Sequence, residues 1–559
     1  MKIGQIAFFS FSLILMAQVP NIIIFHTDEH NFRTLGCYRD QLDSLQAYPW
    51  GTGIEVETPN IDALAENGAI CNKFYANTPV CSPSRSSFVS GKYPQNTSVV
   101  SNHKPLDDNI ITFAEVLTNN GYATGYAGKW HLDGDGKPQW EPPRKFGFQD
   151  NRYMFNRGHW KKYEITDAGP KVACRNSDNQ PSYKLCNADS VSYSSDWLAR
   201  RAIDFIDSNK TSPFAYLVSF PDPHGPNSIR KPYDAMYTHF DYEKPPTESK
   251  SSDGLPEWGM KMKKVIDGSQ LSQYFGMVRC IDDNVGKVIN YLKSENLYEN
   301  TIIVFTSDHG DLLGEHGRNN KGVPFEGSAK IPFILQYPGQ VPKKLVINEA
   351  MATVDFMPTI LSLMNIQHSV DVEGNDASKL FLDQPSEWDD VAFIRGTWTK
   401  GEDWIGAVTS RYKVIYSTDS DTWLYDLEVD PDELVNYYKD PDYFDIVNEL
   451  ALKMKEYGEK FNDTRVQHPK ITAELDSAIA RIQPVSRNNF KYLSAPSISG
   501  IVPEIMLMDV KGAVIKKYKG VGSVRTAIEN ILSANLTKGV YFLRTKTTEG
   551  FVIQKVPVL

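Results

Sequence analysis

The stretch "NIIIFHTDEH", residues 21–30, joins an apolar, β-branched run directly to two acidic residues. Four similar runs follow: "YATGYAG" at 122–128, "FAYLVSF" at 214–220, "TIIVF" at 301–305 and "IPFILQY" at 331–337. Runs of this length are typical of parallel strands that are buried on both faces. Helix-like segments lie between them, so the sequence predicts an α/β sandwich with a mostly parallel central sheet.

Polar residues suited to chemistry follow four of these five runs. In chain order they are Asp28 and Glu29, Lys129 and His131, His224, and Asp308 and His309. Ligands of open α/β sheets bind at the carboxyl ends of the strands. The sequence therefore predicts that these side chains form a single site at one edge of the sheet.

The residue types at this edge favour a hard metal ion. Asp28, Glu29 and Asp308 supply oxygen atoms, which suit Ca²⁺ or Mg²⁺, and His309 adds a nitrogen. The chain has no Cys-x-x-Cys pair and no His-Glu-x-x-His, so neither a zinc finger nor a zincin is supported. Cationic or proton-carrying groups complete the set: Lys129, His131, His224 and Lys321. A metal surrounded by such groups indicates a site for a tetrahedral oxyanion ester.

Length and charge restrict the class of protein. The chain has 559 residues, of which 41% are hydrophobic and 23% charged, enough for a large core and two or three domains. Its 69 acidic and 59 basic residues leave a net charge of -10. This balance argues against binding to nucleic acid or to an anionic membrane through bulk positive charge.

The N-terminus has the pattern of a secretory signal peptide, assigned to residues 1–19. Lys2 precedes an apolar run from Ile6 to Ala17, which is too short for the roughly 20 residues of a transmembrane helix. The sequence therefore predicts export and no transmembrane segment in the mature chain. Export permits disulfides, and Cys174 and Cys186 lie in one polar loop, where they can form one.

The remaining cysteines outside the "CSPSRSSFVSGK" segment lie in more apolar settings. Cys37, Cys71 and Cys280 are interpreted as core thiols, with a Cys37–Cys71 bridge as the alternative.

The sequence changes character after about residue 390. Residues 20–390 form the predicted catalytic α/β domain, and residues 391–485 a smaller α+β subdomain. The stretch "AVTSRYKVIYSTDSDTWLYDLEVDPDE" predicts an antiparallel hairpin that turns at Ser417–Asp421, followed by a helix from about 441 to 460. Residues 486–559 contain short alternating strands and glycine turns, which predict a small β-sandwich tail.

The segment "CSPSRSSFVSGK", residues 81–92, resembles the signature of the formylglycine-dependent sulfatase family, Cys/Ser-x-Pro-Ser-Arg-x-x-x-Leu-Thr-Gly-Arg. The segment departs from it at Val89, Ser90 and Lys92. Four further stretches match family blocks in family order: "PNIIIFHTDEH", "GYATGYAGKWHL", "DPHGP" and "FTSDHGDLLGEHG". The resemblance covers roughly residues 20 to 480, and it implies an alkaline-phosphatase-like fold.

The resemblance implies that Cys81 is oxidised after translation to Cα-formylglycine, with Pro83 and Arg85 in the motif that the maturing enzyme recognises. An ordinary alcohol or thiol that attacked a sulfate ester would leave a sulfated enzyme that hydrolyses slowly. An aldehyde hydrate carries a second hydroxyl that can expel the sulfate. The alternatives for Cys81 are a bare thiol nucleophile, a metal thiolate and a buried structural cysteine.

The resemblance also implies a role for each site residue. Asp28, Asp308, His309 and the hydrated residue 81 would hold one Ca²⁺, while Glu29 stands where the family often has Asp, which leaves its direct ligation open. Arg85 would orient the hydrate, and Lys129 and Lys321 would bind the sulfate oxygens. His224 would protonate the leaving alcohol and His131 would accept the proton of the second hydroxyl. His316 would either support the site residues from behind or have a purely structural role, and the two are equal alternatives.

The C-terminal tail resembles the sorting domain of the type IX secretion system, so the expected location is secreted, periplasmic or at the cell surface. The expected activity is hydrolysis of a sulfated carbohydrate, such as the algal polysaccharide ulvan, its oligosaccharides or a glycosaminoglycan. Candidate sugar contacts are His103, Trp140, His159, Trp160, Arg395 and Trp398. The alternatives are a phosphoester or phosphonate hydrolase of the same superfamily and, if Cys81 is not converted, a protein that binds sulfated glycans without cleaving them.

Overall fold

The computed structural model describes residues 19–249, 255–397 and 403–480, and the backbone of four strands between residues 502 and 558. The chain divides into two compact units, Met1–Ile479 and Ala480–Leu559. The domain boundary predicted near residue 390 falls inside the first unit. The predicted signal peptide lies outside the described residues, except for Val19. No helix in the described part of the chain combines the length and apolarity that a membrane crossing requires.

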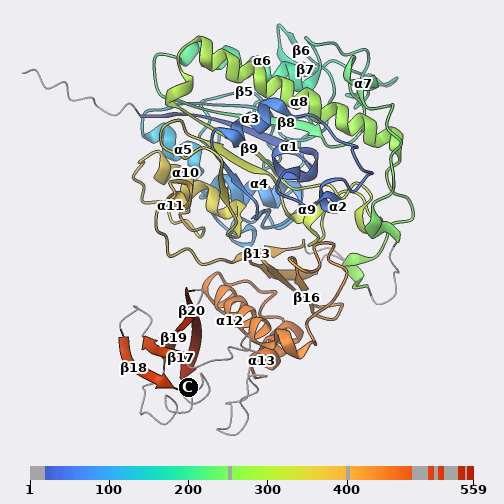
Figure 1. The fold of residues 1–559 in the computed structure, drawn as a ribbon. Coiled ribbons are helices and arrows are strands. Elements are labelled where there is room, and N and C mark those ends of the chain that lie inside the picture. Colours follow the sequence, from blue (N-terminus) through green and yellow to red (C-terminus); the bar gives the residue numbers. More distant parts are fainter. Residues whose placement is uncertain are drawn as a thin grey trace, which may run out of the picture. The chain divides into compact units, whose positions relative to one another are not determined.

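An eight-stranded sheet forms the centre of the first unit, in the order β11-β2-β10-β9-β1-β8-β4-β5 (Figure 1). In that order the strands are β11 (Leu345–Ile347), β2 (Ala69–Cys71), β10 (Phe333–Gln336), β9 (Thr301–Ser307), β1 (Asn21–Asp28), β8 (Phe214–Pro223), β4 (Ala123–Lys129) and β5 (Asp150–Phe155). The five from β9 to β5 are parallel, and β10 is antiparallel to both neighbours. All five predicted strands are present, and the prediction of a mostly parallel sheet is confirmed.

Helices cover both faces of this sheet, which is why its central strands are continuously apolar. In β1, Ile23 and Phe25 face one core and Ile22 and Ile24 the other. The first core includes α3 (Pro59–Glu66), α6 (Ser194–Asn209) and α8 (Gly268–Ser294). The second includes α4 (Cys81–Ser90), α5 (Phe113–Asn119), α10 (Phe356–Leu363) and α11 (Ser378–Phe381). Figure 1 shows α6 and α8 on one side of the sheet and α5 and α10 on the other.

Small elements complete this layer structure. They are the pairs β3 (Phe74–Tyr75) with β12 (Met351–Ala352) and β6 (Tyr163–Thr166) with β7 (Gly169–Val172), and the short helices α1 (Gly36–Arg39), α2 (Ser44–Ala47), α7 (Tyr233–Met236) and α9 (Glu326–Ala329).

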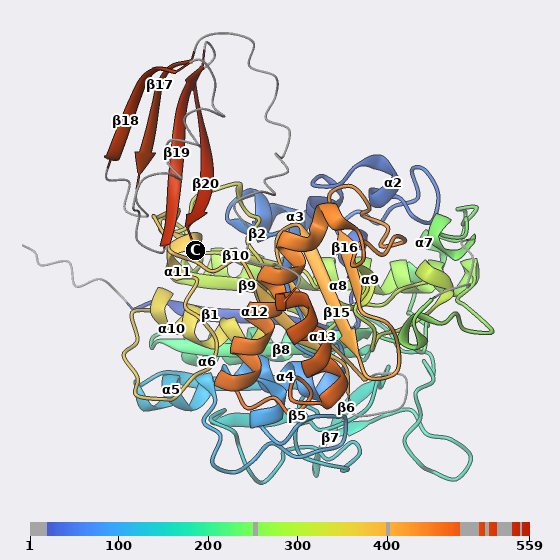
Figure 2. The ribbon, with the colours of Figure 1, turned by 90° about the horizontal axis from the view of Figure 1, so that it is seen from below.

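A four-stranded antiparallel sheet follows in the same unit. Its strands are β13 (Ala392–Arg395), β14 (Trp404–Val408), β15 (Tyr412–Ser417) and β16 (Trp423–Asp426). Two helices, α12 (Phe444–Lys460) and α13 (Pro469–Ala480), share its apolar core and lie across these strands in Figure 2. The predicted hairpin and the predicted helix are therefore confirmed.

The described part of the second unit is one antiparallel sheet, in the order β18-β17-β19-β20. Its strands are β17 (Val502–Met508), β18 (Val514–Val521), β19 (Gly539–Thr547) and β20 (Gly550–Val558). The sequence predicted a sandwich, and a second layer does not occur among these described strands.

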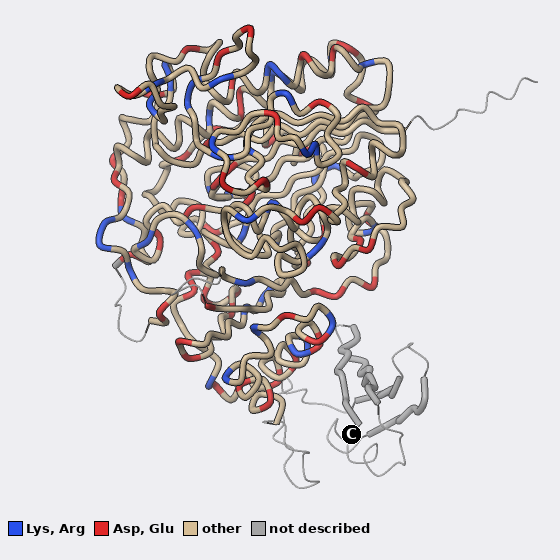
Figure 3. The backbone as a smooth tube through the Cα atoms, turned by 180° about the vertical axis from the view of Figure 1, so that it is seen from behind, with Lys and Arg blue, Asp and Glu red and all other residues tan. Residues whose placement is uncertain are grey.

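The cysteines behave as their surroundings predict. Cys174 and Cys186 form a disulfide. Cys37, Cys71 and Cys280 are free and buried, which confirms the core thiols and excludes the alternative Cys37–Cys71 bridge. Figure 3 shows acidic and basic residues interspersed along the described chain.

Candidate active site

The sheet brings the predicted polar residues to one edge. Asp28 and Lys129 are the last residues of β1 and β4, while Asp308 and His224 follow β9 and β8. These four strands are parallel neighbours in the order β9-β1-β8-β4. Their carboxyl ends therefore lie side by side, as the rule for open α/β sheets predicts.

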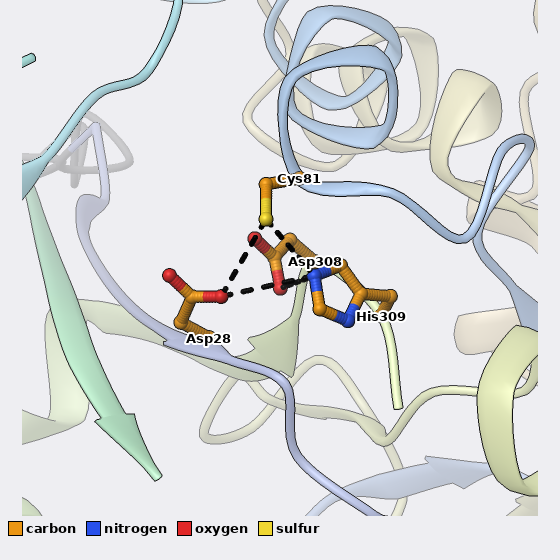
Figure 4. A group of neighbouring side chains, drawn as sticks. All are labelled: Asp28, Cys81, Asp308 and His309. Atoms are coloured by element: carbon orange, nitrogen blue, oxygen red, sulfur yellow. Dashed lines mark hydrogen bonds and ion pairs between the residues drawn. The ribbon is translucent and has the colours of Figure 1, made fainter. Parts of the chain in front are cut away.

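Four buried side chains converge at this edge: Asp28, Cys81, Asp308 and His309 (Figure 4). Each offers one potential ligand atom, and these atoms all lie within 4.8 Å of one another. His309 Nε2 lies 3.2 Å from Cys81 Sγ and 3.3 Å from Asp308 Oδ1. Two carboxylates and an imidazole in this arrangement fit a hard divalent cation, because oxygen atoms predominate among the donors.

Cys81 is the first residue of α4 and only 2% exposed. The amino end of a helix carries partial positive charge, which stabilises a nearby anion. Burial raises the pKa of the Cys81 thiol, but the ammonium groups of Lys129 and Lys321 outweigh burial and lower it to about 6. Position 81 is therefore suited to a negatively charged nucleophilic atom.

Arg85 lies one helical turn after Cys81 and holds the carboxylates of this group. Its Nε donates to Asp308 Oδ2 at 2.8 Å, and its Nη2 lies 3.7 Å from Asp28 Oδ2. Nη1 donates to the carbonyl oxygen of Lys129 at 2.7 Å and to Ser219 Oγ at 2.8 Å. These contacts connect α4 to three strand ends, while the role of Arg85 in orienting residue 81 stays a prediction.

A glycine permits the close approach of β4 to β8 beside these contacts. Gly128 has φ +107°, and a Cβ there would lie 1.8 Å from the carbonyl oxygen of Ser219. Any other residue would separate the two strands next to Lys129.

Two lysines each lie between a carboxylate and a histidine. Lys129 Nζ contacts Asp28 Oδ2 and lies 2.9 Å from His159 Nε2. Lys321 Nζ lies 3.1 Å from Glu29 Oε1 and 2.8 Å from His224 Nε2. Both ammonium groups flank the group around Cys81 and can bind the oxygens of a tetrahedral anion.

Glu29 does not belong to the four-residue group, although the sequence included it among the metal ligands. Its Oε2 lies 3.0 Å from His224 Nε2 and its Oε1 faces Lys321. Burial raises the pKa of the Glu29 carboxyl to about 8. The backbone explains this orientation, because Glu29 has φ +64° and its N–H donates to Asp308 Oδ1.

The sequence predicted His159 as a sugar contact, but the structure places it inside the site, beside Asp28 and Lys129. Its Nε2 lies 3.5 Å from Asp28 Oδ2, and its ring stacks on His224 with centroids 3.5 Å apart. Burial and then the Lys129 charge lower the pKa of His159 to about 3, which makes it a neutral acceptor for Lys129. His159 follows β5, a strand that the apolar runs did not reveal.

A buried ion pair connects the two segments that carry these stacked histidines. Lys161 Nζ lies 2.7 Å from Asp222 Oδ1 and 3.4 Å from the carbonyl oxygen of His224. Lys161 follows His159 by two residues, and Asp222 precedes His224 by two. The pair therefore fixes both segments relative to each other.

His131 lies at the carboxyl end of β4, and its Nε2 is 3.4 Å from His103 Nδ1. Burial lowers the pKa of His131 well below its usual range. No hydrogen bond joins it to Cys81 in the described part of the chain, and its role as a proton acceptor stays a prediction.

Several candidate sugar contacts pack or pair inside the protein instead. Arg395 is buried and lies 2.7 Å from Asp463, and Trp160 is buried against Tyr183. Trp140 packs edge-on against Phe155, Tyr163 and Trp197. His316 is buried and stacks on Phe325, which supports its structural interpretation. Trp398 lies outside the described residues.

Residues 20–366 match the family model described as Sulfatase. The chain belongs to the sulfatase family. Residues 314–460 match a second model, the C-terminal region of N-sulphoglucosamine sulphohydrolase. This sulfatase is therefore a sulfuric ester hydrolase, as the signature around Cys81 predicts.

Characterised relatives and solved structures agree with this assignment. An ulvan-active sulfatase of Formosa agariphila is 28% identical over 79% of this chain and 82% of its own. An N-acetylglucosamine-6-O-sulfatase of Bacteroides thetaiotaomicron is 24% identical over 79% and 87%. A protein solved with its substrate D-glucosamine-2-N,6-O-disulfate has TM-score 0.65 and 20% identity over 81% of this chain and 99% of its own, which shows the shared fold.

Proposed function

We propose that this sulfatase hydrolyses sulfate esters of a sulfated carbohydrate through a formylglycine hydrate derived from Cys81. The convergence of Cys81, Asp28, Asp308 and His309 at the amino end of α4 carries the proposal. The ulvan-active relative and the N-acetylglucosamine-6-O-sulfatase support a sulfated glycan, with an algal polymer such as ulvan as the first candidate.

The residues at the sheet edge fit one Ca²⁺. Asp28, Asp308, His309 and the hydrated residue 81 would hold it, and all four positions are buried. When bound, the ion would supply positive charge to the sulfate oxygens and to the ionised hydroxyl of residue 81.

The side chains of the protein perform the transfer. A hydroxyl oxygen of the residue 81 hydrate attacks sulfur, and the bond from sulfur to the sugar oxygen breaks. Lys129 and Lys321 stabilise the sulfate oxygens as they gain charge. His224 gives a proton to the leaving sugar oxygen. His131 then accepts the proton of the second hydroxyl, the carbon–oxygen bond to sulfate breaks, and the aldehyde forms. Addition of one water molecule to the aldehyde restores the hydrate.

Two measurements test the proposal. Mass spectrometry of the peptide that spans residue 81, from protein produced in its native host, should show formylglycine. Sulfate release should be measured on ulvan, on a glycosaminoglycan panel and on an aryl sulfate, with a phosphonate monoester as the competing substrate. Full activity with an unconverted cysteine contradicts the mechanism. Binding without turnover supports the glycan-binding alternative, and preferred phosphonate cleavage supports the other hydrolase.

The general-acid role of His224 predicts an effect that depends on the leaving group. His224→Ala should slow hydrolysis of sugar sulfates by about 10²–10⁴-fold, because a basic alkoxide needs a proton as it leaves. Aryl sulfates should lose much less, since a phenolate leaves without one. The kcat values of both substrate types in the same preparation check this, and equal losses would remove His224 from the acid role.

We propose that the sulfatase is exported through its signal peptide and its C-terminal sorting domain, which would engage the type IX secretion machinery. Truncation after residue 485 should leave hydrolysis unchanged, since none of the proposed catalytic or metal-binding residues lies beyond Lys321. The same truncation should retain the enzyme inside its native host, which fractionation and sulfate release can measure. A soluble truncated enzyme without activity, or one that is still exported, contradicts the proposal.

A further inference from the structure

A cleft lies in the first unit between the carboxyl edge of the sheet and the four-stranded sheet. Its volume is about 470 Å³, within the range of pockets that bind small ligands. Residues after β1, β2 and β16 line it, together with α9 and the loop between β14 and β15. Asn72 and Asn348 provide amide groups, which suit the hydroxyls of a sugar, while Phe32 and Tyr38 are buried, with 1% of each exposed.

Two lysines on the wall of this cleft lack a hydrogen-bonded partner among the described residues. Lys330 is 5% exposed, and its Nζ lies 3.8 Å from Glu326 Oε2 and 4.1 Å from the centroid of the Phe32 ring. Lys73 Nζ lies 3.9 Å from the same Glu326 oxygen. Both separations exceed hydrogen-bond distance.

The carboxylate that these lysines share is already neutralised. Glu326 Oε1 lies 2.7 Å from Lys413 Nζ and accepts a hydrogen bond from Tyr75 at 3.0 Å. Lys413 also contacts Glu433 at 2.8 Å. Three ammonium groups therefore face two carboxylates in a buried region, which leaves an excess of positive charge.

The other charged residues of the cleft are engaged elsewhere. Arg33 pairs with Glu315 at 3.1 Å, and Arg411 pairs with Asp426 at 2.8 Å and with Glu428 at 2.6 Å. The carboxylate of Asp43 accepts hydrogen bonds from the backbone at the start of α2.

Burial of an unbalanced charge is costly unless a counter-ion or deprotonation removes it. Burial and then the charge of Lys73 lower the pKa of Lys330 to about 7, because the charged form of the amine is unfavourable there. An anion in the cleft would remove it, because both lysines could donate charge-assisted hydrogen bonds to its oxygens.

The cleft is close to the catalytic edge along the chain. Phe32 and Arg33 line it, and they follow Asp28 by only four and five residues. Five residues span at most about 18 Å, which limits the distance between the catalytic edge and this wall of the cleft.

We propose that this cleft is a second anion subsite, in which Lys73 and Lys330 bind a carboxylate or sulfate group on another sugar of the substrate chain. The subsite rests on the proposed function, since it requires a polymeric anionic substrate. It gives the enzyme a preference for oligosaccharides over isolated sulfate esters.

Kinetics on two substrates test the subsite. Lys330→Met keeps an unbranched side chain of similar length and removes the charge that lies over the Phe32 ring. It should raise the KM for a sulfated polysaccharide about tenfold, the effect of one charge-assisted contact, while kcat stays unchanged. Kinetic constants for p-nitrophenyl sulfate should not change, because this substrate carries one anionic group. Lys73→Met should act in the same direction, and Lys344→Met, at a side chain 70% exposed outside the cleft, is the control.

Oligosaccharides that carry only a uronate or only a second sulfate beside the cleaved ester distinguish the two anions. Unchanged polymer KM in both lysine variants, or equal losses on both substrates, would overturn the subsite. A direct measurement separates this result from failure of the proposed function. Calorimetric titration of the wild type with inorganic sulfate should show two sites, and Lys330→Met should retain only one. If the wild type cleaves no polysaccharide but still shows two sulfate sites, the proposed substrate is wrong and the anion subsite stands. If the wild type shows only one sulfate site, the anion subsite is excluded.

Discussion

Cys81→Ala should reduce sulfate release by at least about 10⁴-fold, the scale on which removal of a nucleophile acts in other hydrolases. The substitution removes the thiol whose oxidation would convert Cβ of residue 81 into the aldehyde carbon. Folding should be almost unaffected, because alanine suits the first turn of α4 and Sγ touches polar atoms of the site. Initial rates and thermal unfolding of the same preparation measure both effects.

Cys71→Ala is the matched control for this result. Cys71 is also a buried thiol, but it lies within the second apolar core. Its truncation should lower the free energy of unfolding by about 1–2 kcal/mol through lost packing and leave kcat unchanged. If Cys81→Ala behaves like Cys71→Ala, with lower stability and intact turnover, then Cys81 is structural.

Asp308→Asn should abolish metal binding and lower kcat together, by about 10³-fold or more. Asp308 offers a potential ligand atom beside Asp28 and His309, and it also accepts the hydrogen bond of Arg85. The amide has nearly the same shape without the charge, so the loss reports the electrostatic contribution of several kcal/mol that a metal supplies. Metal content per chain and sulfate release should fall in parallel.

The neighbouring Asp311 provides the control for this substitution. Its Oδ1 accepts hydrogen bonds from the backbone N–H groups of Leu313 and Asn320, and the side-chain amide oxygen introduced by Asp311→Asn can accept the same two bonds. Asp311→Asn should therefore retain metal and activity. Chelation of the wild type followed by separate addition of Ca²⁺, Mg²⁺ and Zn²⁺ should restore activity best with Ca²⁺. Full activity of the metal-free enzyme would exclude a role for the metal.

Much of the fold was predictable because the central strands are buried on both faces. Ile22 to Phe25 and Ile302 to Phe305 are apolar at every position, so the pattern needs no knowledge of distant contacts. β5 was missed because it is an edge strand whose sequence "DNRYMF" begins with polar residues and includes the exposed Arg152, so it contains no continuous apolar run.

The site was predictable where it depends on strand ends and was less so where it depends on side-chain direction. Asp28 ends β1 and Asp308 directly follows β9. These strands are parallel neighbours, so the two carboxylates must lie close together. Glu29 is one residue further, and its positive φ turns it toward His224 and Lys321. The role of His159 depends on β5, so missing that strand also concealed the residue. Aromatic residues such as Trp160 belong to the core because of tertiary packing that no short pattern contains.

The burial of the first turn of α4 has a consequence for the timing of biosynthesis. All ten residues of this helix are buried, including Cys81, Pro83 and Arg85. A maturing enzyme that recognises this motif can reach it only while the polypeptide is still extended. If Cys81 is converted as proposed, conversion would therefore precede folding, and a host that lacks the maturing enzyme would accumulate a correctly shaped protein that later addition of that enzyme cannot activate.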